Sequence, residues 1–112
     1  MPMNAHYALT EPIRDAVDVL SREHPLLVEF GASWCPICES AQPLLAQAFE
    51  GRHERVQHIK VEDGKGQPLG RSFKVKLWPT LIFMKEGVEV ERLVRPTDAA
   101  DIRAALERID GA

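Results

Sequence analysis

Two short, nearly continuous apolar runs constrain the fold more than any other feature of this sequence. The runs are LLVEF at residues 26–30 and TLIFM at residues 80–84. Such runs are typical of strands buried on both faces, because a strand with one wet face would alternate polar and apolar residues. The sequence therefore predicts a sheet whose central strands are covered by other elements on both sides.

Helical patterns alternate with strand patterns along the rest of the chain. Apolar residues recur every three or four positions in three predicted helices, at about 13–20, 35–50 and 102–109. The remaining predicted elements are a strand at 56–61, a short helix near 69–73 and an edge strand from residue 88. This alternation predicts an α/β fold with a mixed sheet and helices on both faces, in one domain spanning residues 1–112.

Several boundaries of these elements can also be predicted. Thr10 and Thr97 are the expected N-caps of the first and last helices. Gly87 suits a tight turn between the last two strands, which must then be antiparallel. The apolar phase slips at Leu93 and Val94, which predicts a bulge or a late bend there.

Composition and charge argue against several classes of function. The chain has 14 basic and 17 acidic residues without long runs of like charge, so neither nucleic acid nor a membrane is an expected partner. Its apolar runs are far shorter than the ~20 residues needed to span a bilayer. The N-terminus lacks a signal-peptide pattern, which predicts a cytoplasmic location. Since no glycine-rich phosphate motif has the required frame, no cofactor is expected.

The two cysteines of the chain, Cys35 and Cys38, lie close together in the stretch GASWCPICESAQP. Cys35 follows a buried strand and opens a helix, where free backbone N–H groups and the helix dipole stabilise a thiolate. Pro36 suits the first turn of that helix. Cys38 lies about one turn further on the same face, within bridging reach. This pattern favours a redox dithiol, in which one sulfur attacks and the other resolves a mixed disulfide.

Other interpretations of the cysteines stay open at this point. They are half of a zinc site or an inert buried pair. Apart from carboxylates, the other ligand candidates are His6, His24, His53 and His58. Only His53 and His58 have a spacing within the range of zinc-binding pairs. Because both lie next to or inside a predicted strand rather than on a helix turn, a metal site is not expected.

Several motifs together resemble the thioredoxin family. They are VEFGASWCPIC, the WPT at 78–80, the hairpin sequence FMKEGVEV, and Pro43 at the place of the family's helix-kinking proline. The resemblance runs from about residue 26 to the C-terminus. It implies the thioredoxin fold and a thiol–disulfide oxidoreductase that reduces protein disulfides. A reductase or a dithiol electron donor would then restore the protein.

The resemblance also implies roles for individual residues. Cys35 would be the nucleophile and Cys38 the resolving thiol, and Pro79 would be a cis-proline that faces them. Glu29 and Lys60 fall at the positions of a buried acid and its lysine partner beneath the second cysteine. They would assist proton transfer to and from Cys38. The alternative for them is a simple buried ion pair.

Departures from the family pattern bear on the direction of electron flow and on the clients. The dipeptide Pro36–Ile37 is similar to that of glutaredoxins and oxidising members, so an oxidase or isomerase is one alternative. Trp34, Trp78 and Arg95, with Pro36 and Pro79, would line the substrate groove and select partners. The alternative for Trp78 is a role in packing alone, and the alternative for Arg95 is a solvated position at the end of a strand. A second alternative function is a non-catalytic module that binds clients in this groove.

Overall fold

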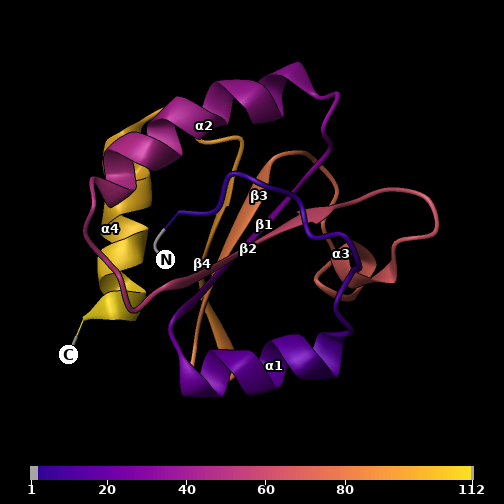
Figure 1. Ribbon diagram of the computed structural model, residues 1–112, viewed down its shortest axis with the longest axis horizontal. Coiled ribbons are helices and arrows are strands. Elements are labelled where there is room, and N and C mark those ends of the chain that lie inside the picture. Colours follow the sequence, from indigo (N-terminus) through magenta and orange to yellow (C-terminus); the bar gives the residue numbers. More distant parts are fainter. Residues whose placement is uncertain (1–2, 112) are drawn as a thin grey trace.

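A central sheet lies between two layers of helices in the computed structural model, which describes residues 3–111 (Figure 1). The elements are, in chain order, α1 (Arg14–Glu23), β1 (Leu26–Gly31), α2 (Pro36–Phe49), β2 (Gln57–Glu62), α3 (Pro68–Ser72), β3 (Thr80–Lys85), β4 (Val88–Val94) and α4 (Ala99–Asp110). The order and type of every element predicted from the sequence are confirmed, with boundaries shifted by a few residues.

The sheet is mixed, as the pattern of buried runs predicts. Its strand order is β2-β1-β3-β4. Strands β1 and β2 are parallel and are connected through α2, whereas β3 is antiparallel to both β1 and β4. Strand β1 lies inside the sheet and is buried along its whole length. Its C-terminal end therefore has a fixed position, and the cysteine segment begins there.

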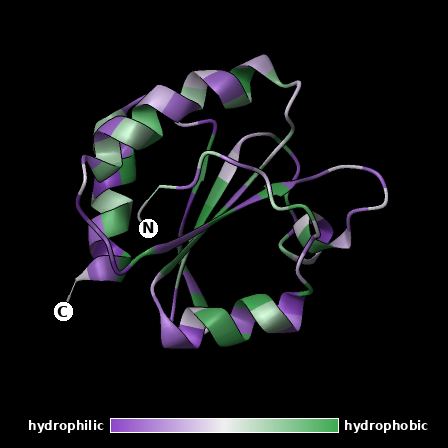
Figure 2. Cartoon of the chain, viewed as in Figure 1, coloured by the Kyte–Doolittle hydropathy of each residue, from purple (hydrophilic) through white to green (hydrophobic). Residues whose placement is uncertain are grey.

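Each face of the sheet carries its own apolar core. On one face, α2 and α4 pack through Leu45 and Ile102 against Phe83 of β3. On the other face, α1 and α3 cover Phe30 of β1, whose ring lies 5.7 Å from that of Phe73. Figure 2 shows hydrophobic residues along the central strands. Each large side chain buried in this way contributes about 1.5–3 kcal/mol to folding, so the two cores hold the sheet rigidly.

Both predicted helix caps are wrong. Helix α1 has Ile13 rather than Thr10 at its N-cap, and no side chain caps it. Helix α4 begins after Asp98, whose carboxylate accepts the N–H of Ala100 at 2.9 Å. A carboxylate at an N-cap also interacts favourably with the helix dipole, which explains why Asp98 is used in place of the neighbouring threonine.

The bulge in β4 lies nearer the start of the strand than predicted. The register shifts between Phe83 and Met84, which pair with Glu91 and Glu89, so Val90 is the extra residue. This shift lets Val90 and Leu93, three positions apart, both pack on the same core. A regular strand would send them to opposite faces, which is the origin of the phase slip in the sequence. The turn before β4 has positive φ at Glu86 and at Gly87, as expected for Gly87.

The N-terminal segment, residues 3–8, runs along the outer side of β2. The Ala8 N–H donates to the Lys60 carbonyl at 2.8 Å, and the Asn4 side chain reaches the His58 carbonyl at 3.4 Å. The sequence shows no periodicity that predicts the position of this segment, because the segment has no regular secondary structure. Among the described residues, the helices are all too short or too polar to cross a membrane.

Candidate active site

The backbone places Cys35 at the start of α2. Strand β1 ends at Gly31, and after a short loop Cys35 becomes the N-cap residue, with Pro36 in the first turn. The Cys35 Sγ accepts the N–H of Cys38 at 3.2 Å. A sulfur that accepts an otherwise unpaired N–H at a helix N-terminus is well placed to carry negative charge. This is the local geometry that the sequence predicts for a nucleophilic thiol.

Cys38 lies deeper than Cys35, and both are free thiols. The exposed fraction is 2% for Cys38 and 7% for Cys35. Burial, followed by the hydrogen bond with Cys35, raises the pKa of Cys38 from 9.0 to about 12. The Cys38 thiol therefore holds its proton at neutral pH.

The peptide bond between Trp78 and Pro79 is cis, and it precedes β3. Trp78 packs against the small cluster formed by Ala32, Cys35 and Cys38. Arg95, at a positive φ of 50°, turns back onto this loop. Its N–H donates to the Pro79 carbonyl at 2.9 Å, and its Nε donates to the Trp78 carbonyl at 2.8 Å. Arg95 is therefore tied to the proline loop rather than being a free strand end.

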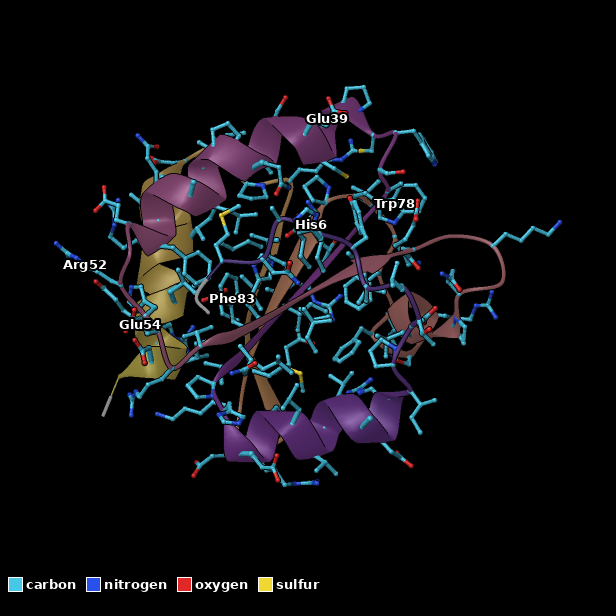
Figure 3. The ribbon with its side chains drawn as sticks, viewed as in Figure 1. His6, Glu39, Arg52, Glu54, Trp78 and Phe83 are labelled. Atoms are coloured by element: carbon cyan, nitrogen blue, oxygen red, sulfur yellow. The ribbon has the colours of Figure 1, made fainter. Side chains whose placement is uncertain are left out.

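Two tryptophans flank the cysteines. Trp34 is 70% exposed, and its ring meets that of Trp78 edge-on at 5.6 Å. The Trp78 Nε1–H donates to Asp63 Oδ2 at 2.8 Å, which fixes the orientation of the indole. Figure 3 shows Trp78 between the first turn of α2 and the loop that precedes α3. Trp78 therefore packs on Trp34 and is also fixed by a hydrogen bond.

Glu29 lies at the centre of a buried polar network, but Lys60 is not its direct partner. Glu29 Oε1 contacts His58 Nε2 at 2.9 Å, and Glu29 Oε2 accepts from Gln42 Nε2 at 2.9 Å. Lys60 Nζ instead donates to Gln42 Oε1 at 3.0 Å. The simple Glu29–Lys60 ion pair is therefore wrong as a prediction, because Gln42 stands between the two groups and His58 occupies the remaining carboxylate oxygen.

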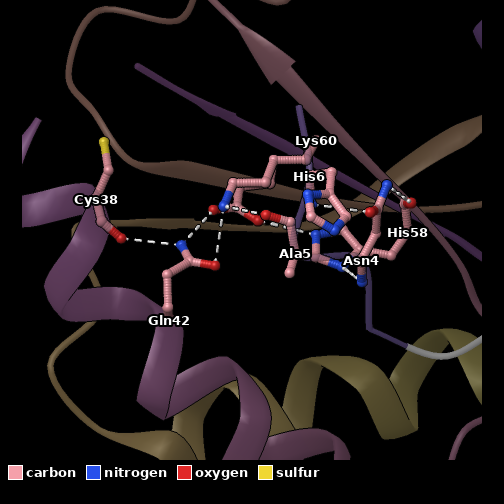
Figure 4. A network of polar contacts seen from close by, with 8 residues as sticks. Asn4, Ala5, His6, Cys38, Gln42, His58 and Lys60 are labelled. Carbon is pink, nitrogen blue, oxygen red and sulfur yellow. Dashed lines mark hydrogen bonds and ion pairs between the residues drawn. The ribbon is translucent and has the colours of Figure 1, made fainter. Parts of the chain in front are cut away.

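The N-terminal segment fixes the tautomer of His58 (Figure 4). The Asn4 backbone N–H donates to His58 Nδ1 at 2.8 Å. A ring nitrogen that accepts a hydrogen bond carries no hydrogen, so the hydrogen of His58 is on Nε2 and is donated to Glu29. Both carboxylate oxygens of Glu29 then accept hydrogen bonds, so neither is left without a partner in the core.

Tyr7 brings the N-terminal segment against Cys38. An added Cβ at Gly31 would lie 2.8 Å from Cys38 Sγ and 3.1 Å from Tyr7 Oη, so both groups use the space that a side chain at Gly31 would fill. Burial, and then the neighbouring Cys38 and Glu29, raise the pKa of Tyr7. Lys60 Nζ lies 4.6 Å from the centre of the Tyr7 ring.

A cavity of about 130 Å³ lies beside Cys38 and is lined by Tyr7, Gln42 and Lys60, among others. Gln42 could have been found from the sequence, because it follows Cys38 by one helical turn. Its Nε2 donates to the Cys38 carbonyl at 2.9 Å. The roles of Tyr7, His58 and Asn4 could not have been found, since their contacts depend on the path of an irregular segment.

The histidines do not gather around the cysteines. His58 is engaged by Glu29 and Asn4, and His53 Nδ1 lies 2.7 Å from Asp110 Oδ2. Within residues 3–111, no group of three or more potential metal ligands comes together. The zinc interpretation of the cysteines thus gains no support from the folded chain.

The fold and the site together define a class of protein. A dithiol that spans the first turn of a helix, with one sulfur at the helix N-terminus and a cis-proline loop beside it, belongs to a thiol–disulfide oxidoreductase. The sequence model of the family described as Thioredoxin matches residues 14–108. The chain belongs to the thioredoxin family, and it is a thiol–disulfide oxidoreductase.

Individual relatives agree with this assignment. The chain is similar to thioredoxin from Mycobacterium tuberculosis, with 37% identity over 93 residues that cover 83% of this chain and 77% of the relative. It is also similar to the structure of thioredoxin 2 from Pseudomonas aeruginosa in its reduced form, with 50% identity and a TM-score of 0.82. That likeness covers 97% of this chain and 98% of the other.

Proposed function

We propose that Cys35 and Cys38 carry the activity and that the dithiol form reduces disulfides in client proteins. The Cys35 thiolate attacks one sulfur of the client disulfide, whose S–S bond breaks, and the second client sulfur leaves and takes up a proton. Cys38 then loses its proton and attacks the Cys35 sulfur of the mixed disulfide. The client sulfur bound to Cys35 leaves and takes up a proton, so that both client sulfurs end as thiols. The two electrons come from the Cys35 and Cys38 thiols, which are oxidised to the Cys35–Cys38 disulfide.

The observation that carries this proposal is the unequal placement of the two sulfurs. Cys35 Sγ is at the helix N-terminus and accepts a backbone N–H, whereas Cys38 is the more deeply buried of the two and its pKa is raised to about 12. This difference supports Cys35 as the attacking thiol and Cys38 as the resolving thiol, which becomes reactive when a base takes its proton.

We assign the handling of that proton to Glu29 and Lys60 acting through Gln42. Gln42 Nε2 bonds both the Cys38 carbonyl and Glu29, and Gln42 Oε1 accepts from Lys60. The cavity lined by Cys38, Gln42 and Lys60 is large enough to admit water, which could carry the proton from the thiol into this network. The positive charge of Lys60 would favour a thiolate at Cys38 during its attack.

The client segment would lie in the groove beside the cis-proline loop. Support comes from Trp34 and Pro36, which are exposed on either side of Cys35 in the chain, and from Arg95, which holds the backbone of Trp78 and Pro79. The neighbouring residues in the chain Ile37, Leu77 and Val94 are also exposed apolar side chains. Large apolar groups at a rim favour extended client segments with apolar side chains next to the disulfide.

The partners and the location follow from the proposed direction of electron flow. A protein that ends each cycle as a disulfide needs a reductase or a dithiol to restore it. Such donors operate in a reducing compartment, and we therefore propose the cytoplasm. We also propose that residues 1–112 act as one domain, since both apolar cores pack on a single sheet.

Insulin reduction with dithiothreitol as the electron donor tests the assignment. We expect wild type to accelerate the reaction and Cys35→Ser to lose that acceleration. Cys38→Ser should attack insulin once and accumulate a mixed disulfide that mass spectrometry detects. Equal rates for wild type and Cys35→Ser would instead favour the alternative that the protein is a non-catalytic module that binds clients. A reduction potential far above that of thioredoxins would reverse the proposed direction and favour an oxidase or isomerase.

A further inference from the structure

A pocket of about 460 Å³ is lined in part by Trp78, the residue that also packs against the cysteine cluster. It is formed by the loop after β2, by α3 and by the segment that leads to the cis-proline. Its charged lining consists of Asp63, Arg71, Lys74 and Lys76. The family roles described above do not use this pocket, although Trp78 joins it directly to the active site.

The pocket gathers positive charge that the rest of the described chain does not neutralise. Residues 63–76 contain four basic side chains and one acidic side chain, whereas the whole chain has a net charge of -3. In residues 3–111, the ion pairs involve other cations, and none forms at Arg71, Lys74 or Lys76. Asp63, the one acid, already accepts from the Trp78 indole.

The backbone around the pocket keeps Trp78 in its wall. An added Cβ at Gly70 would collide with the Asp63 carboxylate, so the absence of a side chain there allows Asp63 to lie against α3. Gly64 has a φ of 133°, and a Cβ added there would lie 3.9 Å from the Trp78 indole. A ligand in the pocket would therefore meet the indole edge and the three cations together, within a few residues of a client bound at Cys35.

We propose that this pocket receives acidic side chains of the client, on the segment that flanks the reacting disulfide. The proposal rests on the function proposed above and narrows it to a class of substrate. Unpaired cations around a concave surface attract carboxylates and speed the encounter with an acidic partner. Because an extended chain advances about 3.3 Å per residue, a segment anchored at Cys35 can cross Trp78 and reach the pocket within a few residues.

Single-turnover reduction of matched peptides tests the proposal. The substrates are disulfide-linked fluorescent peptide pairs that carry three Glu, three Gln or three Lys residues beside the reacting cysteine. Protein reduced beforehand supplies the two electrons, so each turnover yields two peptide thiols and one Cys35–Cys38 disulfide. The pocket variant combines Arg71→Gln, Lys74→Gln and Lys76→Gln. The control combines Arg22→Gln, Arg52→Gln and Lys85→Gln, which removes equal charge from a region outside the pocket.

Wild type and the control should reduce the Glu peptide about tenfold faster than the Lys peptide at low salt, because each exposed ion pair changes affinity by a few-fold. This preference should shrink in the pocket variant and at high salt. The proposal would be overturned if the pocket variant kept the wild-type preference for the Glu peptide over the Lys peptide. It would also be overturned if the control lost as much of this preference as the pocket variant does. The Gln peptide separates a failure of this proposal from a failure of the proposed function. If only the pocket proposal fails, the pocket variant and wild type still reduce the Gln peptide at the same rate. If the proposed function fails, neither protein reduces any of the peptides.

Discussion

Truncation of Gln42 tests whether the buried network depends on this one side chain. In Gln42→Ala, Glu29 Oε2 and the Cys38 carbonyl each lose a donor at 2.9 Å, and Lys60 Nζ loses an acceptor at 3.0 Å. Hydrogen bonds to charged groups contribute about 1.5–3 kcal/mol each and a neutral one about 1 kcal/mol. Because Gln42 is half-buried and water can enter the adjoining cavity, part of this loss is recovered. We expect a net loss of about 2–4 kcal/mol.

The measurement is urea unfolding of the reduced protein, analysed by linear extrapolation. Gln47→Ala is the matched control, because Gln47 lies exposed on the same helix and its side chain makes no hydrogen bond among the described residues. Both variants share the small gain in helix propensity that alanine brings. The control should stay within about 0.5 kcal/mol of wild type. If Gln42→Ala is no less stable than Gln47→Ala, the network does not depend on Gln42 and the proton route through it fails.

Two further predictions concern the surroundings of Cys38. Its pKa rises from 9.0 to about 12 on folding, so the native state holds this proton more tightly than the unfolded chain does. The reduced protein should therefore lose stability as pH rises from 9 towards 12, and Cys38→Ala should lose less over the same range in parallel urea titrations; identical slopes would contradict the assignment. Gly31→Ala should displace Cys38 Sγ and Tyr7 and cost about 1–3 kcal/mol, since its Cβ would lie 2.8 Å from the sulfur. The double variant with Tyr7→Phe, which removes the second obstacle, should recover part of that loss, and no recovery would show that Tyr7 does not share this space.

The parts of the fold that could be predicted depend on local patterns. The buried runs and the helical spacing gave the order of elements and the position of Cys35 at a helix start, because burial and capping act within a few residues. The sequence predicts the register shift too near the end of β4. It shows only a consequence of the shift, which is the changed apolar phase at Leu93. The caps at Ile13 and Asp98 depend on neighbouring loops, which local preferences do not describe.

The site divides in a similar way. The cysteines and the cis-proline belong to compact motifs, and the sequence placed them correctly. The partners of Glu29 could not be found, because His58 is positioned by the N-terminal segment and Gln42 lies between Lys60 and the carboxylate. The contacts of Glu29 join β1, β2, α2 and the N-terminal segment, and no local pattern in the sequence describes how these segments meet.

The two outer strands of the sheet affect how readily the protein aggregates. An open strand edge invites other chains to add to it, which leads to aggregation. Along β2 the edge is occupied by residues 3–8, and along β4 it is interrupted by the extra residue Val90 and carries the charges of Glu89 and Arg92. Both edges are thus protected, and we expect the protein to aggregate more readily when its first eight residues are removed, because the edge of β2 is then open.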